Sequence, residues 1–88
     1  MNITTDGQEV ITPQTGRTAI LVSGNMGAAL VSIGYIDEAD EFTAFEGTET
    51  VTPGRQYLVR HGTQIDPVVN TSGADGSTDF YITVSASH

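Results

Sequence analysis

Turn signals built on glycine and proline recur along this chain at short, fairly even intervals, and alternating apolar residues lie between them. A period of two places every second side chain on the same face of an extended strand, whereas an amphipathic helix needs a period near 3.6. Short alternating segments separated by turns are typical of an antiparallel sandwich or barrel. The pattern therefore predicts an all-β fold.

The residue types point the same way. Thr, Val and Ile together account for 28 of the 88 residues, against three leucines. β-Branched side chains lose rotamer freedom in a helix and pack well on a pleated surface. Since 88 residues make one domain, we expect a single small antiparallel β-sandwich or barrel over residues 1–88, with residues 1–7 as an N-terminal arm.

About seven short strands are expected between the turn signals. They span residues 8–12, 17–23, 28–36, 42–45, 56–61, 65–70 and 78–86. Gly24–Gly27 is expected to form a hairpin turn with a partly buried Met26, and Pro67 to mark an edge strand or a bulge. The inward faces predict a core of Ile20, Val22, Val31, Ile33, Tyr35, Tyr57, Val59, Phe80, Ile82 and Val84.

The charge balance restricts the partners. Eleven acidic residues stand against Arg17, Arg55 and Arg60, which gives a net charge of −8. Three scattered arginines make no basic stripe that would neutralise a phosphate backbone, so nucleic acid is not an expected partner. No apolar stretch approaches the roughly 20 residues of a membrane span, and the first residues do not resemble a signal peptide. We therefore expect no membrane partner and synthesis in the cytoplasm.

Catalytic chemistry has little support in the sequence. There is no cysteine and no lysine, and the only histidines are His61 and His88. A positioned base for a nucleophile is therefore hard to supply, and a Cys/His metal cluster is ruled out. We expect a protein that is not an enzyme, with no catalytic residue, no metal site and no cofactor.

One run of acidic residues, Asp37, Glu38, Asp40 and Glu41, concentrates charge between two predicted strands. Carboxylates that converge can bind Ca²⁺, but the alternate acids around a central glycine that make an EF-hand loop are absent. A solvated turn is the favoured interpretation of this run, and a cation site is the alternative.

A longer pattern covers residues 17–87. The stretch TAILVSG ends in Ser-Gly, a glycine turn follows, and the next stretch, ALVSIGY, has the form V-x-I-x-Y. An acidic hairpin, a Pro-Gly turn before QYLVR and a last strand ending in TVS complete it. This order resembles small β-sandwich structural proteins of tailed bacteriophages, of the capsid decoration or head/tail accessory type. The hairpin of those proteins usually carries a Trp and a Gly, where this chain has DEF and AF.

The resemblance implies a virion component that binds other virion proteins, such as the major capsid protein, and forms a homo-oligomer. The alternative is a free-standing sandwich module that binds carbohydrate or a receptor. An accessory protein on a lattice needs outward-facing groups, and the apolar candidates left over from the predicted core are Phe42, Phe45, Val51, Leu58, Val68 and Tyr81. Because aromatic residues are enriched at the centres of interfaces, the predicted interface residues are Phe42, Phe45 and Tyr81.

Overall fold

The computed structural model describes residues 1–12, 17–59 and 66–87 of the chain. Within these residues the chain forms eight strands and no helix. The strands are β1 (Asn2–Ile3), β2 (Gly7–Val10), β3 (Arg17–Asn25), β4 (Leu30–Ile36), β5 (Phe42–Ala44), β6 (Gln56–Val59), β7 (Val68–Ser72) and β8 (Asp79–Ser87). The predicted all-β antiparallel fold is confirmed, with eight strands in place of about seven.

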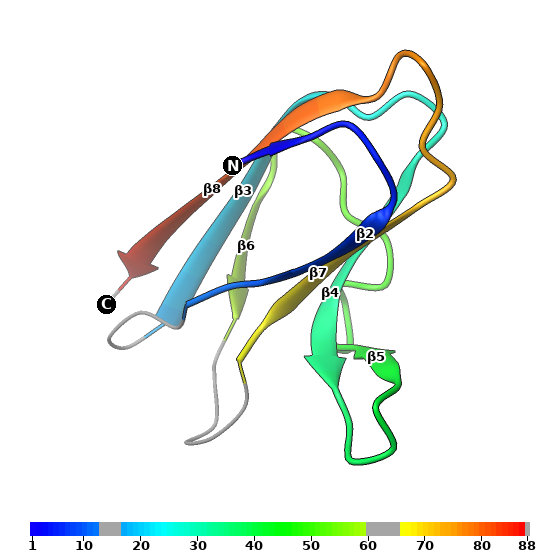
Figure 1. Cartoon of the computed structure of the whole chain (residues 1–88). Helices are drawn as coiled ribbons and strands as arrows, with labels where there is room; N and C mark the ends of the chain where they lie inside the picture. The colour runs from blue at the N-terminus through cyan, green and yellow to red at the C-terminus, as the bar shows by residue number, and fades with distance from the viewer. Residues whose placement is uncertain (13–16, 60–65, 88) are drawn as a thin grey trace.

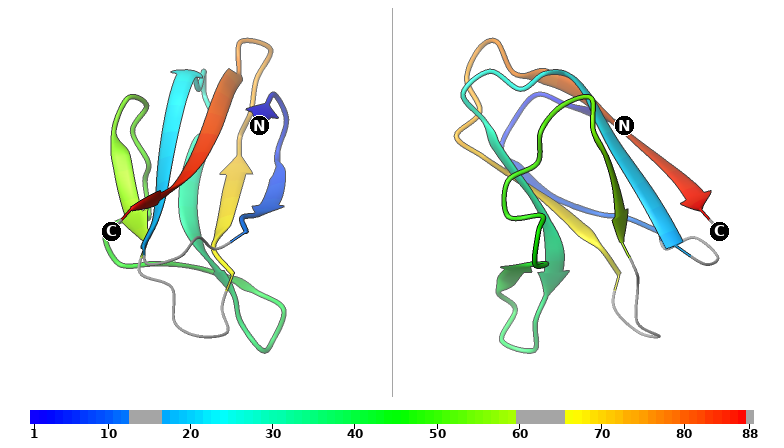
Figure 2. Two further views of the ribbon diagram at one scale, coloured as in Figure 1. Left: turned by 90° about the vertical axis from the view of Figure 1, so that its left-hand side faces the viewer. Right: turned by 180° about the vertical axis from the view of Figure 1, so that it is seen from behind.

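The strands form two antiparallel sheets of four, which Figures 1 and 2 show as two layers. Sheet A has the order β1-β8-β3-β6, and sheet B has the order β2-β7-β4-β5. The pairs β1·β8, β2·β7, β3·β6 and β4·β5 are nested, as if one long hairpin had been wrapped into two layers. Additional pairing of β3 with β8 and of β4 with β7 joins the middle of each layer. An eight-stranded, two-sheet arrangement in this order is a jelly roll.

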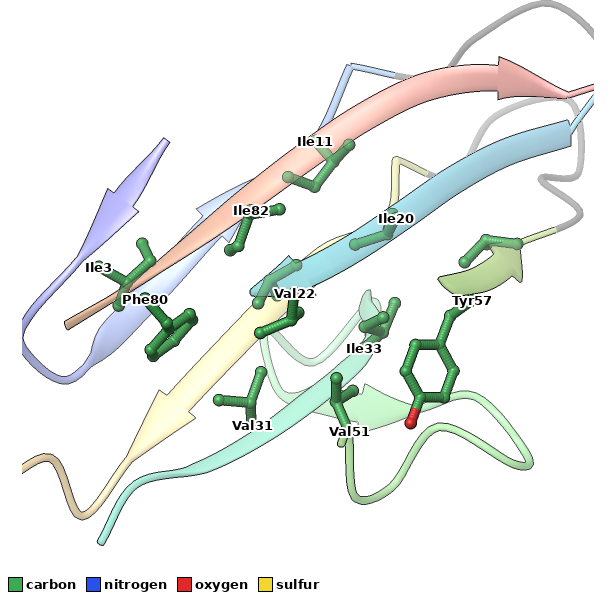
Figure 3. Close-up of a cluster of buried hydrophobic side chains, with 12 residues drawn as sticks. Ile3, Ile11, Ile20, Val22, Val31, Ile33, Val51, Tyr57, Phe80 and Ile82 are labelled. Atoms are coloured by element: carbon green, nitrogen blue, oxygen red, sulfur yellow. The ribbon is translucent and has the colours of Figure 1, made fainter. Parts of the chain in front are cut away.

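The core lies between the two sheets, where apolar side chains from both layers meet (Figure 3). Its buried members are Ile3, Ile11, Ile20, Val22, Val31, Ile33, Val51, Tyr57, Val59, Val69, Phe80 and Ile82. Eight of the ten predicted core residues belong to this cluster. The other two, Tyr35 and Val84, are only partly buried, and Val84 packs against the cluster.

The segment between β3 and β4 is a crossing between the sheets, and the prediction of a hairpin there is wrong. β3 lies in sheet A and β4 in sheet B, and the two strands do not pair with each other. The crossing lets the apolar faces of both strands, with Val22 on one and Val31 on the other, bury each other across the core. Met26 is partly buried against this core, as expected.

Two further segments differ from expectation. Residues 1–7, expected as an arm, contribute β1, and Ile3 at its end is 7% exposed because it faces the core. Pro67 marks neither an edge strand nor a bulge. It directly precedes β7, which pairs with β2 on one side and β4 on the other. A proline is tolerated at the start of a strand because the ladder does not need an N–H there, and the carbonyl oxygen of Pro67 still accepts a hydrogen bond of 2.8 Å from the amide of Ile11.

Candidate functional site

The three predicted interface residues lie on different parts of the sandwich. Tyr81 lies in β8 of sheet A, where its side chain is 55% exposed. Phe42 lies in β5, an edge strand of sheet B, opposite Ile36 of β4, and is half-buried. Phe45 follows the end of β5. The structure therefore does not bring these three aromatic side chains onto one surface.

Phe45 makes contacts that support the fold. Its side chain packs against the hydrophobic core, and its ring lies 5.5 Å from the ring of Tyr35, measured between centroids. Its backbone N–H donates a hydrogen bond of 3.0 Å to the carbonyl oxygen of Ile33. Both the ring and the backbone of Phe45 therefore contribute to the stability of the fold. A substitution of Phe45 would lower that stability, so a loss of binding in such a variant would not identify an interface.

Of the other residues expected to face outward, one is exposed and two are buried. Leu58 is 47% exposed, as predicted, but Val51 and Val68 are each only 2% exposed, so the prediction that these two valines face outward is wrong. Val51 lies outside any strand, and its N–H donates to the carbonyl oxygen of Val31 at 2.8 Å. Its side chain then joins the core from the segment that follows β5.

The outer face of sheet A carries the candidate site. Tyr81, Leu21 and Leu58 lie on it in β8, β3 and β6, each one diagonal step from the next in the strand register. Diagonal neighbours across a sheet are within reach of aromatic and long side chains. We call these three residues the apolar stripe. Leu21 was not predicted as a member, although its place between the inward-facing Ile20 and Val22 already implies that it faces outward.

Charge is nearly absent from the strands. Of the eleven acidic residues, only Glu9 and Asp79 lie in strands, and the others lie in the connecting segments. Among the described residues, the outer face of sheet A therefore has one carboxylate at one end, Asp79, and one guanidinium at the other, Arg17. The apolar stripe lies between them, although the whole chain carries a net charge of −8.

The acidic run forms the turn between β4 and β5. The Asp37 carboxylate accepts hydrogen bonds from the backbone amides of Ala39 at 2.9 Å and Glu41 at 3.0 Å. Asp40 adopts a positive φ of 63°, a conformation that Asp tolerates better than most residues. The other acidic side chains of the turn are exposed. The Asp37 carboxylate thus already stabilises the turn itself.

Two other carboxylates tie the end loops together. Asp6 accepts hydrogen bonds from the amides of Gly73 and Ala74, at 3.2 and 2.7 Å. Asp75 accepts hydrogen bonds from both the hydroxyl and the amide of Ser77. These bonds, the hydroxyl bond first, hold the pKa of Asp75 below its ordinary value. Both carboxylates therefore stabilise loops of the chain itself.

A shallow hollow of about 100 Å³ lies beside the connection from β1 to β2, lined by residues 2–7 with Glu9 and Thr71. Pockets for small molecules usually measure roughly 300–1,000 Å³, so this hollow is too small for such a ligand. Over the described ranges, no three or more His, Asp or Glu residues gather in a way that could hold a metal ion. His61 and His88 lie outside the described residues.

Comparisons of the chain with models of protein families, with curated proteins and with solved structures give no match. In the part of the chain that the structure describes, no helix is long and apolar enough to cross a membrane.

Proposed function

We propose that this chain is a non-enzymatic structural subunit of a bacteriophage virion, a capsid decoration or head/tail accessory protein. It acts by binding other virion proteins, such as the major capsid protein. The order of residues 17–87, with its resemblance to small phage sandwich proteins, supports this role. The jelly-roll strand order adds an analogy at the level of the fold, since viral capsid domains use it, but the fold alone does not define a function.

The observation that carries the proposal is the apolar stripe on a sheet face whose charged side chains, among the described residues, lie only at its two ends. Tyr81 and Leu58 are about half exposed and have Leu21 between them. Contiguous apolar side chains with a polar surround are a feature of protein–protein interfaces, and a tyrosine in such a place is a common anchor. The surrounding Ser, Thr and Gln side chains supply hydrogen-bonding groups without charge.

Binding through this face also avoids an electrostatic penalty. The acidic loops at the two ends of the sandwich repel any acidic partner, whereas the middle of sheet A presents no carboxylate. A lattice protein of either net charge can therefore approach the stripe, with the Asp79 and Arg17 ends left at the rim. Charges at a rim affect the rate of association more than the affinity.

The test is co-sedimentation of the purified protein with phage particles that lack it. We expect wild-type protein to sediment with the particles, and Tyr81→Glu to lose most of this binding, because the substitution buries a charge in the contact. The control is Leu30→Glu, which makes the same charge change at a 63% exposed position on sheet B. Binding by Leu30→Glu but not by Tyr81→Glu supports the proposal.

Failure of the wild-type protein to bind particles, or to bind any isolated shell or tail protein, contradicts the proposal. Equal loss of binding in both variants contradicts the choice of face. The carbohydrate-binding alternative needs an aromatic platform, and among the described residues Tyr81 is the one aromatic side chain that is mainly exposed. A glycan that binds the protein and is released by Tyr81→Ala would favour that alternative.

A further inference from the structure

The second half of β8 is an open edge of sheet A. β1 pairs only with Phe80 and Tyr81, and Met1 extends this ladder by one residue, to Ile82. From Thr83 to Ser87, β8 pairs with β3 on one side, and no described residue pairs with it on the other. Figure 1 shows β1 beside only the first part of β8.

Strand alternation identifies the backbone groups that face this open edge. Ile82 exchanges two hydrogen bonds with Met1, its N–H donating at 2.8 Å and its carbonyl oxygen accepting at 3.2 Å. Ile82 therefore directs its polar backbone groups away from β3. Because these groups alternate along an antiparallel strand, those of Val84 and Ala86 point the same way. Two donors and two acceptors thus line the edge.

Three of the four edge strands, β2, β5 and β6, have features that discourage pairing. β5 has three residues and lies between Glu41 and Glu46, and β6 has four residues and follows Pro53, Gly54 and Arg55. β2 carries an exposed Glu9. Charges, short length and proline are the usual means by which proteins protect edge strands. The open part of β8, with the sequence TVSAS, contains no charge, proline or glycine.

We propose that the open edge of β8 pairs with the same edge of a second copy of this chain. The two strands run antiparallel about a two-fold axis at Ser85, and the two sheets A become one eight-stranded sheet. Val84 then lies opposite Ala86 of the other copy, and each such pair exchanges two backbone hydrogen bonds. The pairing between copies stops at Thr83, because the backbone groups of the preceding residue, Ile82, are already hydrogen-bonded to Met1.

A second copy fits this edge for two reasons. Identical antiparallel strands match each other about a two-fold axis, so one open edge satisfies another without a further surface. Two copies that each carry a net charge of −8 repel each other, but the overlap Thr83–Ser87 contains no charged residue. The pairing therefore places no like charges opposite each other. The inference rests on the proposed function in one respect, because many copies held on a virion lattice would reinforce a small contact through avidity.

Disulfide trapping tests the pairing directly, since the chain has no cysteine of its own. In the proposed register the two copies of Ser85 form a non-hydrogen-bonded pair, with Cα atoms about 4.5 Å apart, within disulfide range. Ser85→Cys should therefore give a disulfide-linked dimer as the main product of mild oxidation. The control is Thr83→Cys on the same exposed face, because its two copies would lie about 14 Å apart along the strands. This control should remain largely monomeric.

Amide hydrogen exchange of the wild-type protein is the second test and needs no variant. The amides of Val84 and Ala86 should exchange more slowly as the protein concentration rises. The amides of Gln56 and Leu58 face the open edge of β6 and should show no such change. Trapping of Ser85→Cys no greater than of Thr83→Cys, or exchange at Val84 and Ala86 that does not depend on concentration, overturns the pairing. Both tests use pure protein, so their outcome is separate from binding to particles.

Discussion

The Asp75 carboxylate accepts a hydrogen bond of 3.1 Å from the backbone amide of Ala28, which lies 47 positions earlier in the chain. Asp75 belongs to the loop before β8, and Ala28 belongs to the crossing from β3 to β4. The same carboxylate accepts two hydrogen bonds from Ser77. One exposed side chain therefore links the crossing between the two sheets to the loop before β8. β8 in turn forms the longest strand pairing of sheet A, with β3.

Replacing Asp75 should weaken this end of the sandwich and change its response to acid. The pKa of Asp75 is lower in the folded chain than its ordinary 3.8. The ionised form therefore stabilises the fold above that pH, and this contribution is lost as the pH falls through the lowered pKa. Asp75→Asn should lower the Tm at neutral pH and make the fall of Tm in acid shallower, as measured by circular dichroism.

The matched control is Glu38→Gln, which makes the same charge change at an exposed residue of the β4–β5 turn. Its Tm at neutral pH should stay close to that of the parent, because surface substitutions away from specific contacts usually have small effects. Equal Tm values for the two variants across the pH range would show that the Asp75 bonds contribute nothing measurable.

The pairing of β4 with β5 depends on the absence of a side chain at Gly34. A Cβ atom there would collide with the carbonyl oxygen of Thr43 and lie 2.7 Å from the Cα atom of Ala44. Gly34→Ala should therefore lower the free energy of unfolding by about 1–3 kcal/mol, the usual cost of overpacking. Gly76→Ala is the control, since a Cβ there meets nothing within 4 Å. Urea unfolding of both variants measures the difference, and a Gly34→Ala variant as stable as the control contradicts this packing.

Alternation predicted the strands and their faces because it is a local property of the sequence. Ile20 and Val22 on one strand, and Phe80 and Ile82 on another, are buried as their positions indicate. A strand with one buried face must alternate wherever it pairs, so these faces follow without knowledge of the partner.

Alternation does not encode which strands share a sheet. The segment Gly24–Gly27 has the glycines of a hairpin, yet the chain crosses there to the other layer, because only the whole topology determines where the apolar face of β4 is covered. The burial of Val51 was missed for a similar reason. Val51 lies in no strand, so its contact with the core comes from tertiary structure and has no periodic signal.

The candidate site was predicted only in part. Tyr81 and Leu58 face outward as the strand pattern requires. Phe45 could not be placed from the sequence, since β5 ends at Ala44 and the alternation ends with it. The open edge of β8 depends on the short length of β1, a segment in which no strand was expected. Whether a strand lies at an edge depends on which strands pair, and the sequence pattern does not show this pairing. The composition of a strand shows only whether it carries the charges or prolines that protect an edge.

A pair of adjacent positions in β4 tests the assignment of faces. Val31 is fully buried in the core, whereas its neighbour Leu30 is 63% exposed on the other side of the strand. Val31→Asp should unfold the domain, because an unpaired buried charge costs several kcal/mol, comparable with the whole stability of a small domain. Leu30→Asp should melt close to the parent in circular dichroism. Similar melting of the two variants would mean that the faces of β4 are wrongly assigned.

The last prediction concerns the acidic turn from Asp37 to Glu41. A cation site needs carboxylate oxygens that are free to converge on the ion. The Asp37 carboxylate already accepts two backbone amide hydrogen bonds within the turn, and the Asp37 carbonyl oxygen accepts another from the amide of Asp40, at 3.0 Å. Binding of Ca²⁺ through Asp37 would have to compete with the bonds that form the turn.

We therefore expect millimolar Ca²⁺ to raise the Tm no more than NaCl of the same ionic strength. Any salt should stabilise the fold slightly by screening the repulsion within a chain of net charge −8. A specific site would add a stabilisation that grows with the Ca²⁺ concentration by mass action. Asp40→Asn is the discriminating variant, because it removes one exposed carboxylate of the turn while leaving the Asp37 bonds in place. A shift that is specific to Ca²⁺ in the parent and absent from Asp40→Asn would establish a cation site at this turn.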